Sequence, residues 1–323
     1  MKTLITGGAG FLGQRLAHTL LKTEQKQIVT ELVLADIAPL RDAALLADAR
    51  VRSVTGDLQH LLAEGLMNGV EGVFHLAAAV SGECEADIDV GLRANLDTTR
   101  ALLDACRGLK HPAKLVFSSS LAVFGGDMPE VIADKTLPMP QNSYGTQKFI
   151  CEQLIADYTR KGYIDGRSVR LPTVTVRPGK PNQAASGFMS GIIREPLAGV
   201  NAICPVDPQT GVWITSPRFA VAGLIAAYET PVQRWGGRTA MNLPGLSLRV
   251  ADMLAALQRH GGAALSARVR VEKVQAIADV VGGWPWRFDT ARARTLGLSG
   301  PAAMDDLIEE YVVDYPQAVA TNP

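Results

Sequence analysis

The chain has 323 residues, with 32 lysines and arginines balanced by 32 aspartates and glutamates. A hydrophobic fraction of 47% excludes a chain that is disordered as a whole, and a net charge of zero excludes the broad positive surface of a nucleic-acid-binding protein. No apolar run approaches the roughly 20 residues of a membrane span. Glycines at 7, 8 and 10 interrupt the apolar start before a signal peptide can form. We expect a cytoplasmic protein without nucleic-acid or membrane partners.

Strand-like and helix-like segments alternate through the first half of the chain. Strands are predicted at 2–6, 31–36, 51–57, 70–78 and 113–120, and helices at 10–21, 90–107 and 143–161. The strand segments LVLA and KLVF are apolar throughout, which is typical of strands buried on both faces. Because parallel strands need helical crossovers, this order predicts an α/β fold with a doubly wound parallel sheet.

The second half is less regular, with many glycines, prolines and serines between residues 183 and 212. A strand is predicted at 167–176, and helices at 190–198, 219–228, 248–260 and 304–315. No repeat or long linker divides the chain. We therefore expect two interleaved parts: a larger domain of 1–176, completed by about 213–245, and a smaller lobe of 177–212 and 246–323.

The strongest local signal lies between the first strand and the first helix. Gly7, Gly10 and Gly13 in TGGAGFLG have the spacing G-x-x-G-x-x-G. Such glycines permit a tight turn, close approach of the backbone to a pyrophosphate, and close packing of helix on sheet. The helix N-terminus also attracts phosphates. This context predicts a dinucleotide site in the larger domain and leaves substrate binding to the smaller lobe.

Two acidic residues at strand ends refine this prediction. Asp36 closes the second strand, where a carboxylate can accept hydrogen bonds from ribose hydroxyls and would repel a 2′-phosphate. NAD is therefore favoured over NADP. Asp57, followed by Leu58, is placed to contact the adenine edge. A helix cap for Asp36 and a turn acid for Asp57 are the ordinary alternatives.

Tyr144 and Lys148 are four residues apart, on one face of a predicted helix start. A free tyrosine, with a pKa of about 10, is a poor base at neutral pH. Two unit charges about 4 Å apart interact by about 4 kcal/mol at an effective dielectric of about 20, so the lysine can lower the pKa of the tyrosine. Tyr144 could then remove a hydroxyl proton while hydride leaves the same carbon. Such pairs alone are common on helix surfaces, but a serine-rich strand end, Ser118-Ser119-Ser120, precedes this one.

Together these motifs resemble the extended short-chain dehydrogenase/reductase family, which includes NAD-dependent sugar-nucleotide epimerases and dehydratases. The resemblance covers nearly the whole chain. Its other carriers are Gly56-Asp57-Leu58, HLAA at 75–78, Asn95 and Arg177-Pro178-Gly179. It implies a Rossmann-type sheet with a smaller interleaved substrate lobe, bound NAD, and a homodimer formed through helices that include 90–107 and 143–161.

The resemblance also implies roles for single residues. Ser120 would hydrogen-bond the substrate oxygen, Tyr144 would be the acid and base, and Lys148 would hold the nicotinamide ribose and lower the pKa of Tyr144. His75 is expected as a packed strand residue. The residues expected at NAD are Gly7, Gly10, Phe11, Leu12, Gly13, Asp36, Asp57, Leu58, Leu76, Ala77, Ala78, Asn95, Ser118, Tyr144, Lys148 and Pro172.

Two segments depart from the family pattern. The usual Val-Tyr-Gly after the serine strand is Val123-Phe124-Gly125, which loses a hydroxyl. Epimerases carry an aromatic–Ile–His–Val–x–Asp stretch before the returning helix, whereas this chain reads WITSPR from Trp213, with Arg218 near the position of the acid. An arginine in place of an acid suggests a different substrate, although Arg218 also fits a simple pair with a neighbouring carboxylate.

Longer segments, such as LAAAVSGECEADIDVGLRANLDTTRALL, resemble a narrower subgroup that oxidises the C2 hydroxyl of D-erythronate, a four-carbon sugar acid, to the 2-oxo acid with NAD. A sugar acid needs a cation for its carboxylate and polar groups for its hydroxyls. The candidate cations are Arg177, Arg194 and Arg218; the candidate hydroxyl partners are Ser81, Ser120, Thr173, Asn182 and Ser186; and the candidate pocket walls are Phe188 and Trp213. Each of these residues, taken alone, also fits a structural role.

Other chemistries have little support in the sequence. The five histidines and the four cysteines, which lie far apart, show no metal-ligand spacing, so no metal is expected. Two alternatives remain beside the sugar-acid dehydrogenase. One is a nucleotide-sugar epimerase or dehydratase that retains NAD, and the other is an NAD-sensing protein without catalysis.

Overall fold

The computed structural model describes residues 1–22, 29–179 and 184–320. The chain forms two compact units. The first comprises Met1–Ser119, Asn142–Arg170 and Val221–Met241, and the second comprises Ser120–Gln141, Leu171–Ala220 and Asn242–Pro323.

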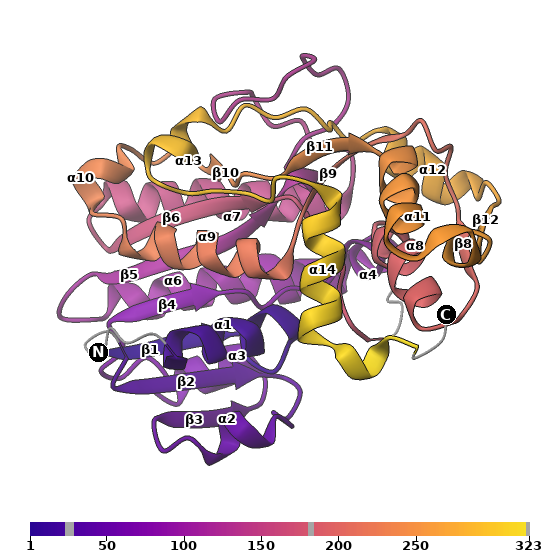
Figure 1. Cartoon of the computed structure of the whole chain (residues 1–323). Coiled ribbons are helices and arrows are strands. Elements are labelled where there is room, and N and C mark those ends of the chain that lie inside the picture. Colours follow the sequence, from indigo (N-terminus) through magenta and orange to yellow (C-terminus); the bar gives the residue numbers. More distant parts are fainter. Residues whose placement is uncertain (23–28, 180–183, 321–323) are drawn as a thin grey trace. The chain divides into compact units, whose positions relative to one another are not determined.

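A seven-stranded sheet dominates the first unit, with strand order β10-β6-β5-β4-β1-β2-β3 (Figure 1). The strands are β1 (Lys2–Thr6), β2 (Glu31–Asp36), β3 (Val51–Thr55), β4 (Gly72–His75), β5 (Ala113–Ser120), β6 (Ile164–Leu171) and β10 (Met241–Asn242). β1 pairs in parallel with β2 and β4, β2 with β3, and β4 with β5. The predicted doubly wound α/β fold is confirmed. Its strand order reverses between β1 and β4, where such sheets bind ligands.

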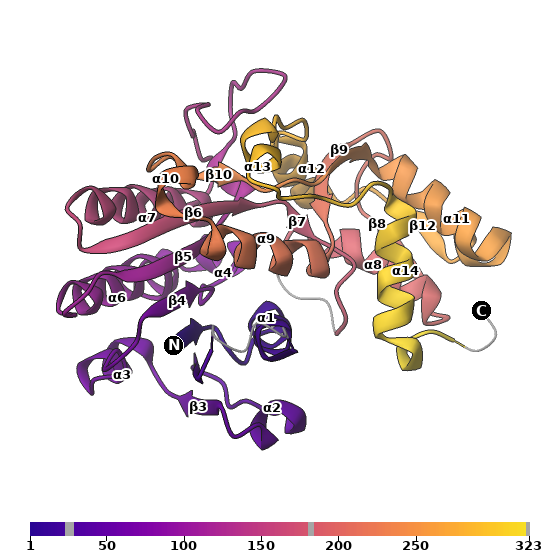
Figure 2. The same cartoon turned by 60° about the vertical axis from the view of Figure 1, so that its left-hand side comes forward.

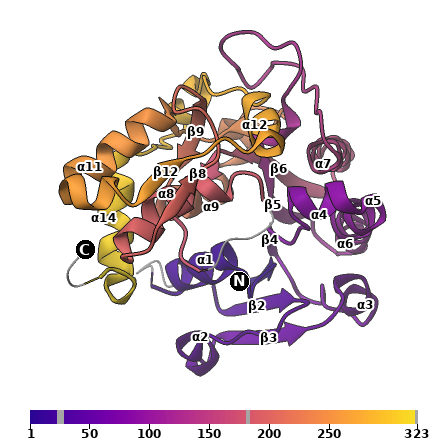
Figure 3. The ribbon, with the colours of Figure 1, turned by 90° about the vertical axis from the view of Figure 1, so that its right-hand side faces the viewer.

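Helices pack on both faces of this sheet, with α3, α6 and α7 on one face and α1 on the other (Figure 3). The helices of this part are α1 (Phe11–Lys22), α2 (Ala43–Ala47), α3 (Leu58–Ala63), α4 (Ser81–Ala86), α5 (Ile88–Gly91), α6 (Thr98–Arg107), α7 (Ser143–Arg160), α9 (Pro217–Glu229) and α10 (Val232–Trp235). Leu102 of α6 and Ile155 of α7 join Leu4, Val73 and Leu115 of the strands in one core cluster. This cluster buries one face of the strands, and α1 lies on the other face (Figure 3).

The helix predicted over 90–107 is less regular than expected. It begins with α5, continues as a π-helix, η1 (Leu92–Asp97), and ends as α6. The side chain of Asp87 accepts hydrogen bonds from the N–H groups of Asp89 and Val90 and so caps the start. Single π-helical turns are frequent at functional sites. Asn95 lies in this turn and is buried.

The second unit contains two small sheets and a helical layer (Figure 2). One sheet has the order β11-β9-β7 and the other pairs β12 with β8. The strands are β7 (Thr173–Val174), β8 (Ala202–Cys204), β9 (Gly211–Thr215), β11 (Leu246–Arg249) and β12 (Val269–Val271); the helices are η2 (Leu121–Val123), α8 (Gly187–Leu197), α11 (Val250–Ser266), α12 (Gln275–Gly282), α13 (Ala291–Thr295), α14 (Met304–Asp314) and η3 (Pro316–Ala318). Residues of α8, α11 and α14, among them Ile193, Met253 and Leu307, share one core cluster.

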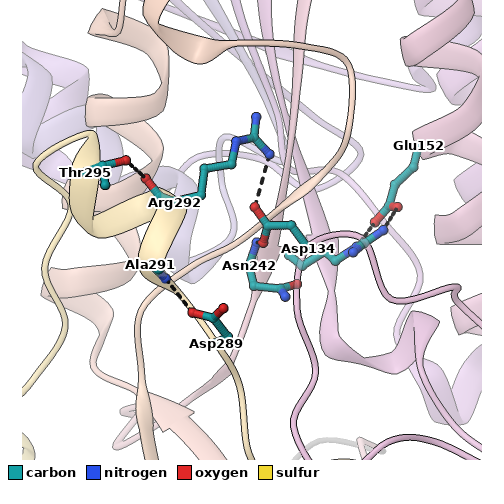
Figure 4. Close-up of polar contacts among 8 residues, drawn as sticks. Asp134, Glu152, Asn242, Asp289, Ala291, Arg292 and Thr295 are labelled. Atoms are coloured by element: carbon teal, nitrogen blue, oxygen red, sulfur yellow. Dashed lines mark hydrogen bonds and ion pairs between the residues drawn. The ribbon is translucent and has the colours of Figure 1, made fainter.

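Two expectations about this region need correction. The strand predicted over 167–176 is two strands in different sheets, β6 and β7, because Pro172 stands between them and has no N–H to donate to a ladder. Residues 120–141, expected in the larger domain, belong to the second unit. Their backbone and side chains bind its C-terminal part. Ile132 exchanges backbone hydrogen bonds with Arg287 and Asp289, and Asp134 accepts hydrogen bonds from Arg292 and from the N–H of Asn242 (Figure 4).

Candidate active site

The glycine loop between β1 and α1 is tightly folded. Gly7 has φ +71°, and a Cβ there would lie 2.8 Å from the backbone nitrogen of Ala77. A Cβ on Gly13 would lie 2.1 Å from the carbonyl oxygen of Gly7. Both positions therefore require glycine. A bare backbone turn that leads into a helix N-terminus suits a pyrophosphate, so the cradle fits a dinucleotide.

Asp36 lies at the end of β2 and contacts this loop. Its Oδ2 accepts a hydrogen bond from the N–H of Ala9 at 3.0 Å, and its Oδ1 accepts one from Ala38 at 3.0 Å. The carboxylate thus lies beside the glycine loop, where a ribose is expected. Asp57 instead accepts hydrogen bonds from the N–H groups of Gln59 and His60 and caps α3. Contact of Asp57 and Leu58 with adenine stays a prediction.

A second loop follows β4 and is held at two points. The N–H of Ala77 donates to the hydroxyl of Thr6 at 3.3 Å, and the N–H of Ala79 donates to Oδ1 of Asn95 at 2.8 Å. Asn95 also donates from Nδ2 to the side-chain oxygen of Gln147 at 2.8 Å. Asn95 therefore supports this loop from the π-turn. Ala78 at the loop's tip is exposed.

Lys148 is buried beside the end of β5. Its Nζ donates to the carbonyl oxygen of Ser118 at 2.9 Å, and it lies 4.6 Å from the ring centre of Phe117 and 5.7 Å from that of Tyr144. Burial lowers the pKa of Lys148 to about 8, against the opposing effects of nearby Cys151, Cys84 and Glu152. The structure thus places the predicted tyrosine and lysine together, and a pKa of about 8 keeps most of the lysine protonated at neutral pH.

The start of α7 positions Tyr144. Asn142 caps this helix, because its side-chain oxygen accepts a hydrogen bond from the N–H of Gly145 at 2.8 Å. The carboxylate of Glu85 accepts another from the N–H of Ser143 at 3.1 Å. Tyr144, in the first turn, is partly exposed. The sequence offered a signal for this cap, since Asn is a common residue immediately before the first residue of a helix.

The three serines that end β5 have different partners. Ser118 donates its hydroxyl to the carbonyl oxygen of His75 at 3.2 Å, and Ser119 donates to Oε1 of Glu152 at 2.5 Å. Ser120, which begins the second unit, accepts a hydrogen bond from the N–H of Ala122 at 3.1 Å. As an acceptor in that bond, Ser120 keeps its own hydroxyl hydrogen for donation.

A buried ion pair behind β5 was missed in the sequence. Arg170 donates from Nε to Oε1 of Glu152 at 2.9 Å and from Nη2 to Oε2 at 2.7 Å (Figure 4). Both side chains are almost completely buried. Together with Ser119, the pair joins α7, β6 and the end of β5, so it fixes the strand end that carries the serines. Glu152 follows Lys148 by one helical turn, which was the one signal available.

The candidate arginines of the second unit already make contacts. Arg194 forms an ion pair with Glu195 and donates from Nη1 to the carbonyl oxygen of Arg177 at 2.8 Å. The N–H of Arg177 donates to the hydroxyl of Ser190 at 3.2 Å. Arg218 is mostly exposed and lies 3.5 Å from the carboxylate of Glu310. For Arg218, the structure shows the simple carboxylate pair.

The other substrate candidates lie on several elements: Thr173 on β7 and Trp213 on β9 belong to paired strands of the second unit. Trp213 is buried and stacked on Phe288, with ring centres 3.6 Å apart, and a Cβ on Gly245 would lie 2.9 Å from both Trp213 and Pro172. The remaining candidates are Ser81, the first residue of α4 in the first unit, Thr173 on β7, Ser186 before α8, and Phe188, which packs against the core of the second unit. Asn182 lies outside the described residues. All these roles stay predictions.

Two further findings concern residues 1–22, 29–179 and 184–320. In these ranges no three His, Cys, Asp or Glu side chains are grouped so that they could hold a metal ion. None of the helices in the same ranges is both long enough and apolar enough to cross a membrane.

The glycine cradle, the acidic end of β2 and the switch point between β1 and β4 define a dinucleotide-binding α/β protein. Comparison with known proteins gives the family. The model described as "NAD dependent epimerase/dehydratase family" matches residues 3–208. The chain belongs to this family, and its cofactor is NAD.

Full-length relatives carry two different names. The chain is 49% identical to a D-erythronate dehydrogenase of Cupriavidus necator, covering 97% of this chain and 98% of the relative. It is 43% identical to a D-erythronate dehydrogenase of Haemophilus influenzae, covering 97% and 99%. A crystal structure described as a nucleoside-diphosphate-sugar epimerase of Agrobacterium tumefaciens is 38% identical, with a TM-score of 0.93, and covers 98% of this chain and 95% of that one.

Replacing Gly13 with Ala is expected to weaken NAD binding by at least about tenfold, because the new Cβ would overlap the carbonyl oxygen of Gly7 and push the loop out of place. Titration calorimetry with NAD measures the effect. Gly282→Ala is the matched control, since a Cβ there meets nothing within 4 Å. An unchanged dissociation constant in Gly13→Ala would show that the loop does not contact NAD.

Proposed function

We propose that this protein oxidises the C2 hydroxyl of D-erythronate to 2-oxo-D-erythronate, with NAD as the hydride acceptor. The observation that carries the proposal is the 49% identity, over 97% of the chain, to a protein named for this reaction. The buried lysine beside Tyr144 supports a dehydrogenase of this kind rather than a binding protein, because an NAD sensor needs no paired acid and base.

Each proposed catalytic residue has one task. Tyr144 removes the proton of the C2 hydroxyl, and Ser120 donates a hydrogen bond to the same oxygen as it becomes a carbonyl. Lys148, placed 5.7 Å from the ring centre of Tyr144, favours the phenolate when it carries its proton. NAD, when bound, would supply the acceptor for the hydride of C2. The O–H and C–H bonds break, the C=O bond forms, and the proton leaves through Tyr144.

The carboxylate of the substrate needs a cation, and we propose it is met in the second unit by one of Arg177, Arg194 and Arg218. Arg194 donates to the carbonyl oxygen of Arg177, so these two arginines are neighbours. Arg218, on α9, pairs instead with Glu310 of α14. Single alanine variants of Arg177, Arg194 and Arg218 separate the three candidates, because the bond between Arg194 and Arg177 uses only the backbone of Arg177. The variant of the residue that binds the carboxylate raises the KM for erythronate.

The direct test is to mix purified protein, NAD and D-erythronate and to follow the formation of NADH. Steady production of NADH is expected. The name of the 38% identical structure favours the alternative, a nucleotide-sugar epimerase, which would retain NAD and give no net NADH. Turnover of a nucleotide sugar without oxidation of any four-carbon sugar acid would overturn the proposal.

We further propose that the enzyme is a cytoplasmic homodimer that associates through α6 and α7. The resemblance to the family supports this arrangement. Ile150 of α7 and Ile88 of α5 are large apolar side chains that are exposed in the first unit. Light scattering on the purified protein, which gives the mass in solution, tests the dimer.

A further inference from the structure

His75, the last residue of β4, is the centre of a chain of buried hydrogen bonds. Its Nδ1 lies 2.7 Å from the hydroxyl of Thr6, and its Nε2 lies 2.9 Å from the hydroxyl of Thr99. All three residues are buried. Thr6 ends β1, immediately before the glycine loop, and Thr99 is in the first turn of α6.

The direction of each hydrogen bond in this chain follows from its two ends. Thr99 donates its single hydroxyl hydrogen to the carbonyl oxygen of Asn95 at 2.5 Å, so it must accept from Nε2–H of His75. The hydroxyl of Thr6 accepts from the N–H of Ala77 and donates to Nδ1 of His75. The geometry therefore places a proton on Nε2 of His75, and a ring this deeply buried beside neutral partners is neutral, so Nδ1 accepts from Thr6. Burial and nearby Lys148 agree, since they lower the pKa of His75 to about 3.

Both ends of this series of hydrogen bonds lead to the loop that follows β4. The N–H of Ala77 binds the hydroxyl of Thr6, and the N–H of Ala79 binds the side chain of Asn95. The backbone carbonyl oxygen of Asn95 in turn accepts the hydrogen bond from Thr99. Asn95 also binds Gln147, the residue before Lys148. A Cβ on Gly91 would lie 2.5 Å from the amide nitrogen of Gln147, so glycine makes room for this contact. This series of hydrogen bonds thus connects β1, β4, the π-turn and α7.

We propose that His75 is a positioning residue for NAD: through Thr6 and Thr99 it holds the loop at Leu76–Ala79 against the glycine loop. The inference rests on the proposed placement of NAD at Leu76–Ala78, but not on the identity of the substrate. A neutral ring with its proton on Nδ1 could not accept the hydrogen bond from the Thr6 hydroxyl and could not donate one from Nε2 to Thr99. The proposed NAD site therefore requires the Nε2-protonated tautomer of His75.

The first test is the tautomer itself. In protein labelled with ¹⁵N at histidine, long-range proton–nitrogen correlation spectra at neutral pH distinguish the two neutral forms, and a His75→Gln variant assigns the signal. A neutral ring protonated on Nε2 is expected. A ring protonated on Nδ1, or on both nitrogens, overturns the proposal, whatever the enzyme oxidises.

The second test removes single hydroxyls and measures the affinity for NAD. Thr99→Val and Thr6→Val each keep the side chain's shape and delete one link to His75. Losing one such bond is expected to raise the dissociation constant of NAD by about tenfold. Thr99→Ser, which keeps the hydroxyl, is expected to restore most of the affinity.

Each variant has a matched control on its own element. Thr98, next to Thr99, donates its hydroxyl to the carbonyl oxygen of Arg93 at 2.8 Å and accepts from Gln59 at 3.4 Å, so its hydroxyl bonds to groups outside the chain of Thr6, His75 and Thr99. Thr3, on the same strand as Thr6, is buried, and its hydroxyl has no hydrogen-bond partner in the described part of the chain. Thr98→Val and Thr3→Val are expected to change the affinity by less than about twofold.

The pairs separate positioning from a general loss of packing. Equal losses of NAD affinity in a variant and its control would overturn the proposal, because the effect would then be structural. Unchanged affinity in Thr99→Val and Thr6→Val would overturn it too, by removing the loop from the NAD site. If either variant fails to fold, the other and the tautomer decide. None of these outcomes depends on whether erythronate is the substrate.

Discussion

A Tyr144→Phe variant is expected to lose about 10²–10⁴-fold in kcat and to bind NAD almost unchanged. The substitution removes one hydroxyl and keeps the ring, whose centre lies 5.7 Å from Nζ of Lys148, so the packing of the lysine persists. What is lost is the group that takes the substrate's proton. Initial rates of NADH formation and titration of NAD binding measure the two effects separately.

The matched control is Tyr158→Phe on the same helix, α7. Tyr158 donates its hydroxyl to Asp104 at 2.5 Å, and this bond raises the pKa of Tyr158 to about 12, so it is unsuited to act as a base. Its loss is expected to leave kcat within about twofold of the wild type. Full activity of Tyr144→Phe would remove Tyr144 from the mechanism.

The second large effect is on stability. Arg170→Met is expected to lower the free energy of unfolding by about 3–5 kcal/mol, because it leaves the Glu152 carboxylate buried without the charge that compensates it. Ser119 is a neutral partner of Glu152 and cannot replace that charge. Urea denaturation followed by circular dichroism measures the loss.

An exposed ion pair on α7 provides the comparison. Arg160 pairs with Asp157 at 2.6 Å, and both side chains are about half exposed. Arg160→Ala is expected to cost about 0–1 kcal/mol, since solvent screens such pairs. A similar small cost in Arg170→Met would mean that Glu152 is protonated, hydrated or paired with another cation in the variant.

The parallel sheet was predictable because its strands are locally distinctive. LVLA in β2 and KLVF in β5 are short apolar runs, which are typical of strands buried on both faces of a parallel sheet. The break between β6 and β7 had a visible cause in Pro172, but the two resulting strands join different sheets, and sequence periodicity does not report pairing partners. The short strands β8 and β12, of three residues each, are too brief for a periodic signal.

The site was predictable where chemistry follows spacing along the chain. Glycines three apart, and a lysine four residues after a tyrosine, can be found by counting. The contacts of Glu152 with Arg170, and of His75 with Thr6 and Thr99, join residues from separate elements, and nothing in their local sequence marks them. His75 was expected as a packed strand residue, and it is buried as expected. Its hydrogen bonds became visible only with the fold.

The burial of all four cysteines has a practical consequence for spectroscopy. Cys84, Cys106, Cys151 and Cys204 are free and buried, and burial raises the pKa of each thiol, that of Cys106 to about 12. Maleimide dyes react with exposed thiolates. A cysteine introduced at an exposed position should therefore be labelled selectively in the native protein, with the four natural cysteines left in place.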